Sequence, residues 1–177
     1  VLNPHIWHDA MLWKSVVTFI ADNLVKMNEE NKQVYYQNEE IVLYTLTSLD
    51  KYIKEQVALI PKEKRVLVTE HDAFAYFGKA YGFETLSIQG ISTYSEVSSI
   101  DINKLADILI EKNVDTIFLE ATVPARNIKL LQSTLKARGH FVKIGGTLYA
   151  DTLGHNNTYD KMMRHNIDTI DSALSNK

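Results

Sequence analysis

The sequence has no cysteine, and its 177 residues include only 3 prolines and 7 glycines. The lack of cysteine excludes disulfide bonds, zinc–thiolate sites, iron–sulfur clusters and a cysteine nucleophile. Because proline and glycine dominate turns, their scarcity predicts that most of the chain forms regular elements, above all helices. The length and the 45% of hydrophobic residues suffice for one domain, or for one domain and part of a second.

A strong charge of one sign is also missing, since 19 basic and 22 acidic residues give a formal net charge of −3. A nearly neutral chain has no bulk attraction for nucleic acid or for an anionic membrane, so we expect no nucleic-acid partner. No apolar run reaches the roughly 18 residues that span a membrane. The chain opens at Val1 with neither an initiator Met nor a signal-like stretch, and we interpret it as a mature or excised fragment.

Apolar residues recur at helical spacing in the first 60 positions. One helix is predicted from about residue 9 to 27, with a stripe formed by Leu12, Val16, Phe19, Ile20 and Leu24. A second is predicted from about residue 31 to 59, with a stripe formed by Val42, Leu46, Leu49, Ile53 and Val57. This helix would be roughly 40 Å long, which suits a strut between two bodies. Pro61 ends it, so we expect a boundary between residues 1–61 and 62–177.

After Pro61, short β-branched runs alternate with helical segments. Strands are expected at about residues 65–70, 83–88, 114–119 and 141–144. Helices are expected at about residues 71–81, 102–112, 125–138 and 159–173. The alternation predicts a doubly wound, mostly parallel sheet, so the fold class is an α/β lobe preceded by a long linker helix.

The carboxyl ends of the predicted strands carry candidate metal ligands. Ligands of open α/β sheets bind beyond those ends, where His71 follows the first strand and Asp151 lies in the loop after the last. Imidazole and carboxylate suit zinc, manganese and iron, so the two residues form a plausible half of a metal site. The alternative is that His71 caps a helix and Asp151 starts a turn.

The other histidines carry weaker signals. His5 follows Pro4 in an extended stretch, and His8 could share a helical face with it, which makes a two-histidine chelate conceivable. A solvent-facing His8 is the simpler interpretation. We expect His140 to be a surface residue, His155 to be a loop residue near Asp151 and therefore a weak candidate, and His165 to be structural or exposed.

Signals of catalysis are few. There is neither a Gly-x-Ser-x-Gly elbow nor a Walker phosphate loop. Glu96 and Glu120 could form an acid–base pair, but helix capping or arginine binding is the favoured interpretation.

Several segments, among them residues 3–7 and 71–77, resemble the extracytoplasmic metal-binding proteins of bacterial zinc and manganese ABC transporters. Asn3-Pro4-His5-Ile6-Trp7 corresponds to Asp-Pro-His-x-Trp in that family, and His71-Asp72-Ala73-Phe74-Ala75-Tyr76-Phe77 matches a second motif. Further matches are residues 90–93 with Glu96, 117–120, 145–151 with Gly154, and 159–169. The resemblance covers essentially the whole chain in the right order.

The resemblance implies two α/β lobes joined by one long helix, here about residues 31–59, with the metal between the lobes. Of four usual ligands, His5 would be the second, His71 the third and Asp151 the fourth. The N-terminal lobe, the first ligand histidine and the histidine-rich loop of zinc-type members have no counterpart, so the chain resembles the C-terminal half of such a protein. Asn3 stands where the family has Asp, which would alter the hydrogen bonding of His5.

The implied function is that of the substrate-binding component of an ABC transporter, in the periplasm or as a cell-surface lipoprotein. It would capture zinc, manganese or iron as a transported ligand, deliver it to a membrane permease, and not be an enzyme. Binding should weaken below about pH 6 as histidines protonate. Two alternatives are a metal-dependent hydrolase, with Glu70, Glu96 or Glu120 as base, and a surface adhesin or interaction module. Uncovered helical surface could also drive self-association of the fragment.

Overall fold

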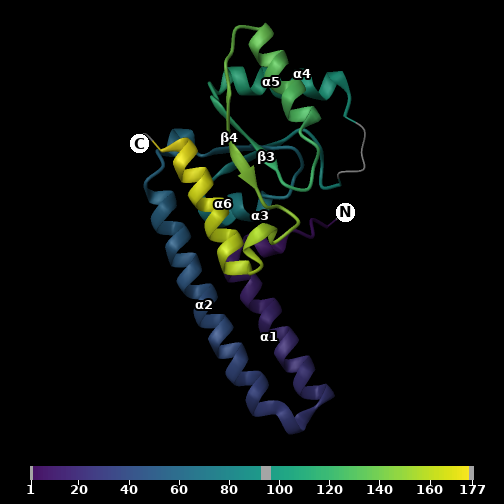
Figure 1. Ribbon diagram of the computed structural model, residues 1–177, viewed down its shortest axis with the longest axis vertical. Helices are drawn as coiled ribbons and strands as arrows, with labels where there is room; N and C mark the ends of the chain where they lie inside the picture. Colours follow the sequence, from purple (N-terminus) through teal and green to yellow (C-terminus); the bar gives the residue numbers. More distant parts are fainter. Residues whose placement is uncertain (1, 93–96, 176–177) are drawn as a thin grey trace.

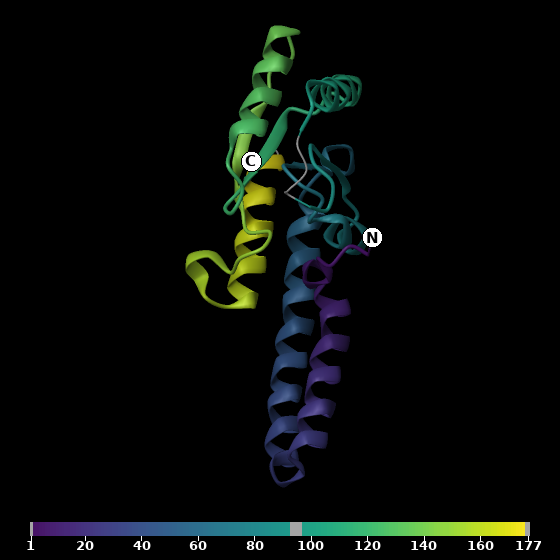
Figure 2. The ribbon, with the colours of Figure 1, turned by 90° about the vertical axis from the view of Figure 1, so that its right-hand side faces the viewer.

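The computed structural model describes residues 2–92 and 97–175 and consists of a long helical hairpin attached to an α/β lobe (Figure 1). The hairpin consists of α1 (Ala10–Met27), the 3-10 turn η2 (Glu29–Asn31) and α2 (Lys32–Ala58), and the two helices lie side by side in both views (Figure 2). The 27 residues of α2 span about 40 Å. Both helices predicted for this part of the chain are confirmed to within about one residue. Within the described residues, no helix combines the length and the apolar character of a membrane span.

The hairpin buries only part of its apolar surface. In α2, four of the five residues of the predicted stripe are buried, namely Leu46, Leu49, Ile53 and Val57. In α1 the predicted stripe is not a buried face, because the exposed residues include Leu12, Phe19, Ile20 and Leu24. The buried positions of α1 are Ala10 and Ala21. Small side chains therefore allow α1 to approach its neighbours, while its larger apolar side chains remain in contact with water.

The lobe contains parallel strands that alternate with helices. The strands are β1 (Val66–Thr69), β2 (Glu84–Ser87), β3 (Thr116–Glu120) and β4 (Lys143–Leu148), with β1 paired to β2, β3 paired to β4, and β1 in contact with β3. The helices are α3 (Ala75–Tyr81), α4 (Ser99–Glu111), α5 (Arg126–Ala137) and α6 (Tyr159–Leu174). Single 3-10 turns are η1 (Ile6–His8), η3 (Lys62–Lys64) and η4 (Gly154–Asn156). The predicted α/β lobe with parallel strands is confirmed.

Two predicted boundaries near the candidate ligands are wrong. The helix expected from residue 71 begins only at Ala75, so His71 lies in a loop and does not cap the helix. The strand expected to end at residue 144 continues to Leu148, through Gly145 and Gly146. A Cβ atom at Gly145 would lie 2.6 Å from the ring of Phe118, so glycine here permits close strand packing and does not mark a turn. The longer β4 carries the chain to the edge of the sheet just before Asp151.

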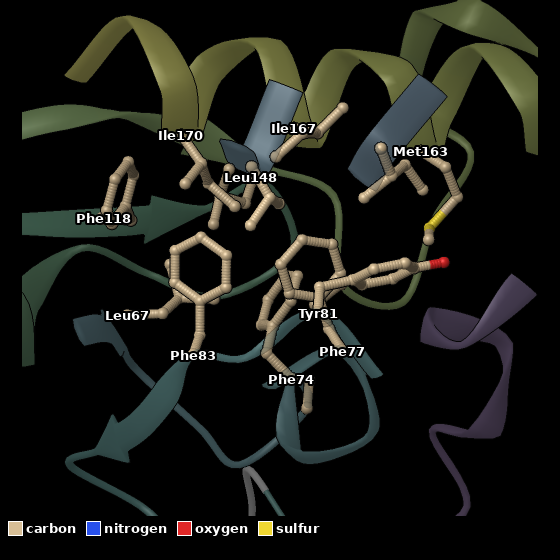
Figure 3. Close-up of a cluster of buried hydrophobic side chains, with 14 of the residues drawn as sticks. Leu67, Phe74, Phe77, Tyr81, Phe83, Phe118, Leu148, Met163, Ile167 and Ile170 are labelled. Atoms are coloured by element: carbon tan, nitrogen blue, oxygen red, sulfur yellow. The ribbon is translucent and has the colours of Figure 1, made fainter. Parts of the chain in front are cut away.

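Helices cover both faces of the strands, as a doubly wound fold requires. Leu67 and Phe118 pack in a cluster with residues of α2, α3 and α6 (Figure 3), whereas their neighbours Val68 and Ile117 pack in a second cluster with α4 and α5. This division follows from the alternation of side chains along a strand. The first cluster also contains Leu49, Ile53, Val57 and Ile60, so the core of the lobe includes the second half of α2.

Candidate metal centre

The structure brings His5, His71 and Asp151 together at the carboxyl edge of the strands. His5 precedes η1, His71 follows β1 after one residue, and Asp151 lies in the loop after β4. Nε2 of His5 lies 3.2 Å from Oδ1 of Asp151, and Nε2 of His71 lies 3.2 Å from Oδ2 of the same carboxylate. The two Nε2 atoms are 3.4 Å apart. Both imidazoles are buried and Asp151 is exposed, so the cluster lies at the surface of the lobe.

Asn3 orients the ring of His5. Its Oδ1 lies 2.7 Å from Nδ1 of His5 and also accepts the backbone N–H of His5 at 3.1 Å. Because an amide oxygen only accepts, Nδ1 carries the hydrogen and Nε2 presents its lone pair to the cluster. Asn3 is held in turn, since its Nδ2 donates to the backbone oxygen of Asp72 at 3.2 Å. An asparagine therefore supplies the acceptor that the resemblance assigns to an aspartate.

Glu120, the last residue of β3, orients the ring of His71. Its Oε2 lies 2.5 Å from Nδ1 of His71, and its Oε1 accepts the backbone N–H of His71 at 2.9 Å. Both side chains are almost completely buried. The sequence-based preference for a helix-capping or arginine-binding role of Glu120 is wrong. Since Nδ1 of His71 faces the carboxylate of Glu120, the other ring nitrogen, Nε2, is directed toward Asp151.

The cluster binds one proton when no metal competes for it. Burial alone would lower the pKa of His71, but contacts with Asp151 and Glu120 outweigh burial and raise it to about 9. Burial is the main cause that lowers the pKa of His5, while the hydrogen bond with His71 lowers the pKa of Asp151. At neutral pH, the proton therefore resides on His71, His5 is neutral and Asp151 is ionised.

The carboxylates proposed as catalytic bases do not form an acid–base pair in the described residues. Glu70 is fully buried, and its Oε1 accepts the backbone N–H of Ile128 at 3.3 Å. Burial is the main cause that raises the pKa of Glu70 to about 7. Glu120 is engaged with His71. Glu96 lies outside the described residues.

The remaining histidines lie outside the three-residue cluster. The prediction of a solvent-facing His8 is wrong, because its ring is completely buried and its Nε2 lies 3.1 Å from the backbone oxygen of Ala150. His140 is half-buried, and its Nε2 lies 2.6 Å from the backbone oxygen of Val114. It is therefore not the plain surface residue that was expected. His155 is exposed, but it lies in the 3-10 turn η4 and not in a loop as predicted. His165 is half-buried, and its Nε2 lies 2.9 Å from the backbone oxygen of Thr147, which fits the expected structural role.

Sequence reasoning missed the specific contacts of Asn3, Glu120 and His8. A local signal existed for Asn3, because an Asx side chain can bond to the backbone two residues further on. Glu120 and His8 had no such signal, since their partners lie 49 and 142 residues away in the chain.

Comparisons with known proteins identify a family and several related proteins. Residues 2–173 match the ZnuA family, described as zinc-uptake complex component A, periplasmic. The chain is 40% identical over 177 residues to the zinc-binding protein TroA of Treponema pallidum, covering 98% of this chain and 58% of that protein. It superimposes on the TroA structure with a TM-score of 0.93, covering 98% of this chain and 64% of that one.

Other relatives are described with different metals. The manganese-binding lipoprotein MntA of Bacillus subtilis is 39% identical over 176 residues, covering 97% of this chain and 58% of that protein. The Fe(III)-bound structure of YtgA from Chlamydia trachomatis is 26% identical with a TM-score of 0.88, covering 97% of this chain and 63% of that one. The chain thus spans less than two thirds of the length of these relatives. The match over residues 2–173 nevertheless shows that it belongs to the ZnuA family of metal-binding solute-binding proteins of zinc and manganese ABC transporters.

Proposed function

We propose that the full-length protein captures a divalent transition metal outside the cytoplasmic membrane and delivers it to an ABC permease. His5, His71 and Asp151 are the metal ligands contributed by this chain, and zinc, manganese or iron is the transported ion. The protein works in the periplasm or as a cell-surface lipoprotein, as the names of its relatives suggest. It makes and breaks no covalent bond and is therefore not an enzyme.

The spacing of the three candidate donor groups is the observation that carries this proposal. Nε2 of His5 lies 3.2 Å from Oδ1 of Asp151, and Nε2 of His71 lies 3.2 Å from Oδ2 of Asp151. The two Nε2 atoms are 3.4 Å apart. Ligands about 2.0–2.1 Å from a tetrahedral zinc ion are about 3.3 Å from one another. The donor groups therefore lie nearly as far apart as the ligands of a bound ion must. Contacts at Nδ1 already orient both imidazole rings.

We also propose that residues 1–61 and 62–177 have different tasks in the full-length protein. Residues 62–177 form the metal-binding lobe, and α2 is the long helix that links it to a second lobe. Two features support this assignment. α2 extends well beyond the lobe (Figure 1), and the apolar stripe of α1 beside it is exposed.

Isothermal titration of the chelator-treated full-length protein with zinc, and separately with manganese, tests the proposed function. We expect one ion per protein molecule. At equal geometry, zinc should bind more tightly, as the Irving–Williams order requires. A protein that binds neither ion would contradict the proposal, whereas chelator-sensitive turnover of ester or phosphate substrates would support the hydrolase alternative.

Zinc affinity should rise with pH up to about pH 9. The pKa of His71 is raised to about 9 without metal, and zinc requires its Nε2 to be deprotonated. Below this pKa, zinc must displace one proton, so each unit of decrease in pH should weaken binding up to about tenfold. Titrations from about pH 6 to pH 9, in buffers of different ionisation enthalpy, would count the released proton. An affinity that is constant over this range would contradict the assigned proton on His71.

The 177-residue chain alone should self-associate through the exposed stripe of α1. Phe19 is 68% exposed and Ile20 is 49% exposed, and apolar patches of this kind favour association. Sedimentation velocity should show a mass that increases with protein concentration. Phe19→Glu should weaken this association. Phe141→Glu is the control and should not weaken it, because Phe141 is also exposed (71%) but lies just before β4 and not in α1. A monomer at every concentration would contradict the prediction.

A further inference from the structure

His8 lies where the three segments that carry the candidate ligands meet. The side chain follows His5 by three positions and is completely buried. Its ring centroid lies 4.4 Å from that of Phe74, which belongs to the same loop as His71. Its Nε2 lies 3.1 Å from the backbone oxygen of Ala150, the residue before Asp151. One side chain thus connects the segments of all three candidate ligands.

The contact with Ala150 is a hydrogen bond with a defined direction. A carbonyl oxygen only accepts, so Nε2 of His8 must carry the hydrogen. Nε1 of Trp7 donates to the same oxygen at 3.0 Å. The backbone oxygen of Trp7 accepts in turn from the hydroxyl of Tyr159 at 2.7 Å. Two donors from η1 therefore hold the backbone immediately before Asp151.

This anchoring matters because Asp151 lies outside any helix or strand and its side chain is 36% exposed. Its carboxylate can contact His5 and His71 together only if the loop after β4 keeps its position. The backbone of Ala150 is the nearest point at which a buried side chain fixes that loop.

Packing alone does not account for a histidine at this position. Nδ1 of His8 is buried without a hydrogen-bond partner among the described residues. A buried polar atom without a partner is destabilising, so an apolar ring would fill the same space at lower cost. What the imidazole adds over an apolar ring is the donor to Ala150.

We propose that His8 is a positioning residue of the metal site, which holds Ala150 and thereby places Asp151 within reach of His5 and His71. His8 does not touch the ion. The inference rests on the proposed function of metal capture, and it adds a determinant of affinity that the three ligands alone do not contain.

The test compares His8→Phe and His8→Gln with the full-length wild-type protein. Phenylalanine retains a ring against Phe74 but removes the donor, so zinc affinity should fall about 10-fold, the lower end of the range for outer-shell partners. The visible absorption spectrum of bound Co²⁺ should also change, because Asp151 is displaced. Glutamine restores an N–H donor and should recover part of the affinity and of the spectrum. The melting temperature of the metal-free His8→Phe variant should not fall.

His140→Phe is the matched control, since it also removes an imidazole nitrogen that bonds a backbone carbonyl, that of Val114. It should leave zinc affinity and the Co²⁺ spectrum unchanged. Unchanged binding and an unchanged spectrum in His8→Phe would overturn the inference while the proposed function stands. Equal losses in His8→Phe and His8→Gln would overturn it too, because the hydrogen bond would then be irrelevant. A wild-type protein that binds neither zinc nor Co²⁺ would refute the proposed function, and the role of His8 with it.

Discussion

Replacing both His71 and Asp151 with alanine is expected to lower the zinc affinity of the full-length protein by about 1,000-fold or more. Loss of one outer-shell partner typically costs about 10–100-fold in metal affinity, and here two proposed direct ligands would be lost. The remaining donor of the cluster would be His5, whose Nε2 lies 3.2 Å from the Asp151 carboxylate in the intact site. A competition assay with a zinc-binding dye would measure the change.

Two further variants keep this test informative. Removing the imidazole of His71 leaves the buried Oε2 of Glu120 without its partner, so the double variant has reduced stability and its fold must be checked by circular dichroism. Asp151→Asn avoids this problem, because it keeps the shape of a partly exposed side chain and removes only its charge. We expect a loss of about 100-fold for this single change.

A control with the same two chemical changes is His155→Ala combined with Asp107→Ala. Both side chains are exposed, and the ion pair of Asp107 with Arg138 lies at the surface, where such pairs contribute little to stability. This variant should bind zinc as the wild-type protein does. Wild-type affinity in the His71 and Asp151 double variant would show that the metal binds elsewhere.

Phe77→Ala should lower the free energy of unfolding of the metal-free protein by about 3–5 kcal/mol, the usual range for a large side chain removed from a core. Phe77 is fully buried in α3, and its ring lies 4.9 Å from that of Tyr81 and 5.6 Å from that of Phe83 (Figure 3). The cavity left by the ring lies within the cluster that joins α2, α3 and α6. Urea denaturation in the presence of a chelator would measure the change.

Phe141→Ala is the control for this prediction, because Phe141 is 71% exposed. Its replacement should change the free energy of unfolding by no more than about 0.5 kcal/mol, as for ordinary surface positions. Equal effects of the two substitutions would contradict the burial described for Phe77.

Most of the secondary structure was predictable because local periodicity reflects it directly. The four-and-three spacing of Leu46, Leu49, Ile53 and Val57 matches the face that α2 buries. Errors in the predicted strand and helix boundaries arose where one residue type occurs in two structural contexts. The strand was predicted to end before Gly145, yet Gly145 and Gly146 lie inside β4, where neighbouring side chains, among them Phe118 and Thr169, leave no room for a Cβ atom. The stripe of α1 was correctly identified as apolar, but no local rule says what covers it.

The candidate site shows the same division. The residue types of His71 and Asp151, and their positions after strands, were visible in the chain, since parallel strands bring their carboxyl ends to one edge. The contacts that orient these candidate ligands were not visible in the sequence. Glu120 reaches His71 from 49 residues away, and His8 reaches Ala150 from 142 residues away.

The sequence by itself therefore determined the order of helices and strands and the parallel α/β class, and it indicated His71 and Asp151 as candidate donors, because these depend on local periodicity and on residue chemistry. His5 was added as a candidate only by the family resemblance. Only the tertiary structure decided that the donor atoms lie 3.2–3.4 Å apart, that the proton of the metal-free cluster resides on His71, and that His8 is buried against Ala150. The physical reason is that donor distances, pKa values and burial depend on which segments, distant along the chain, pack against one another.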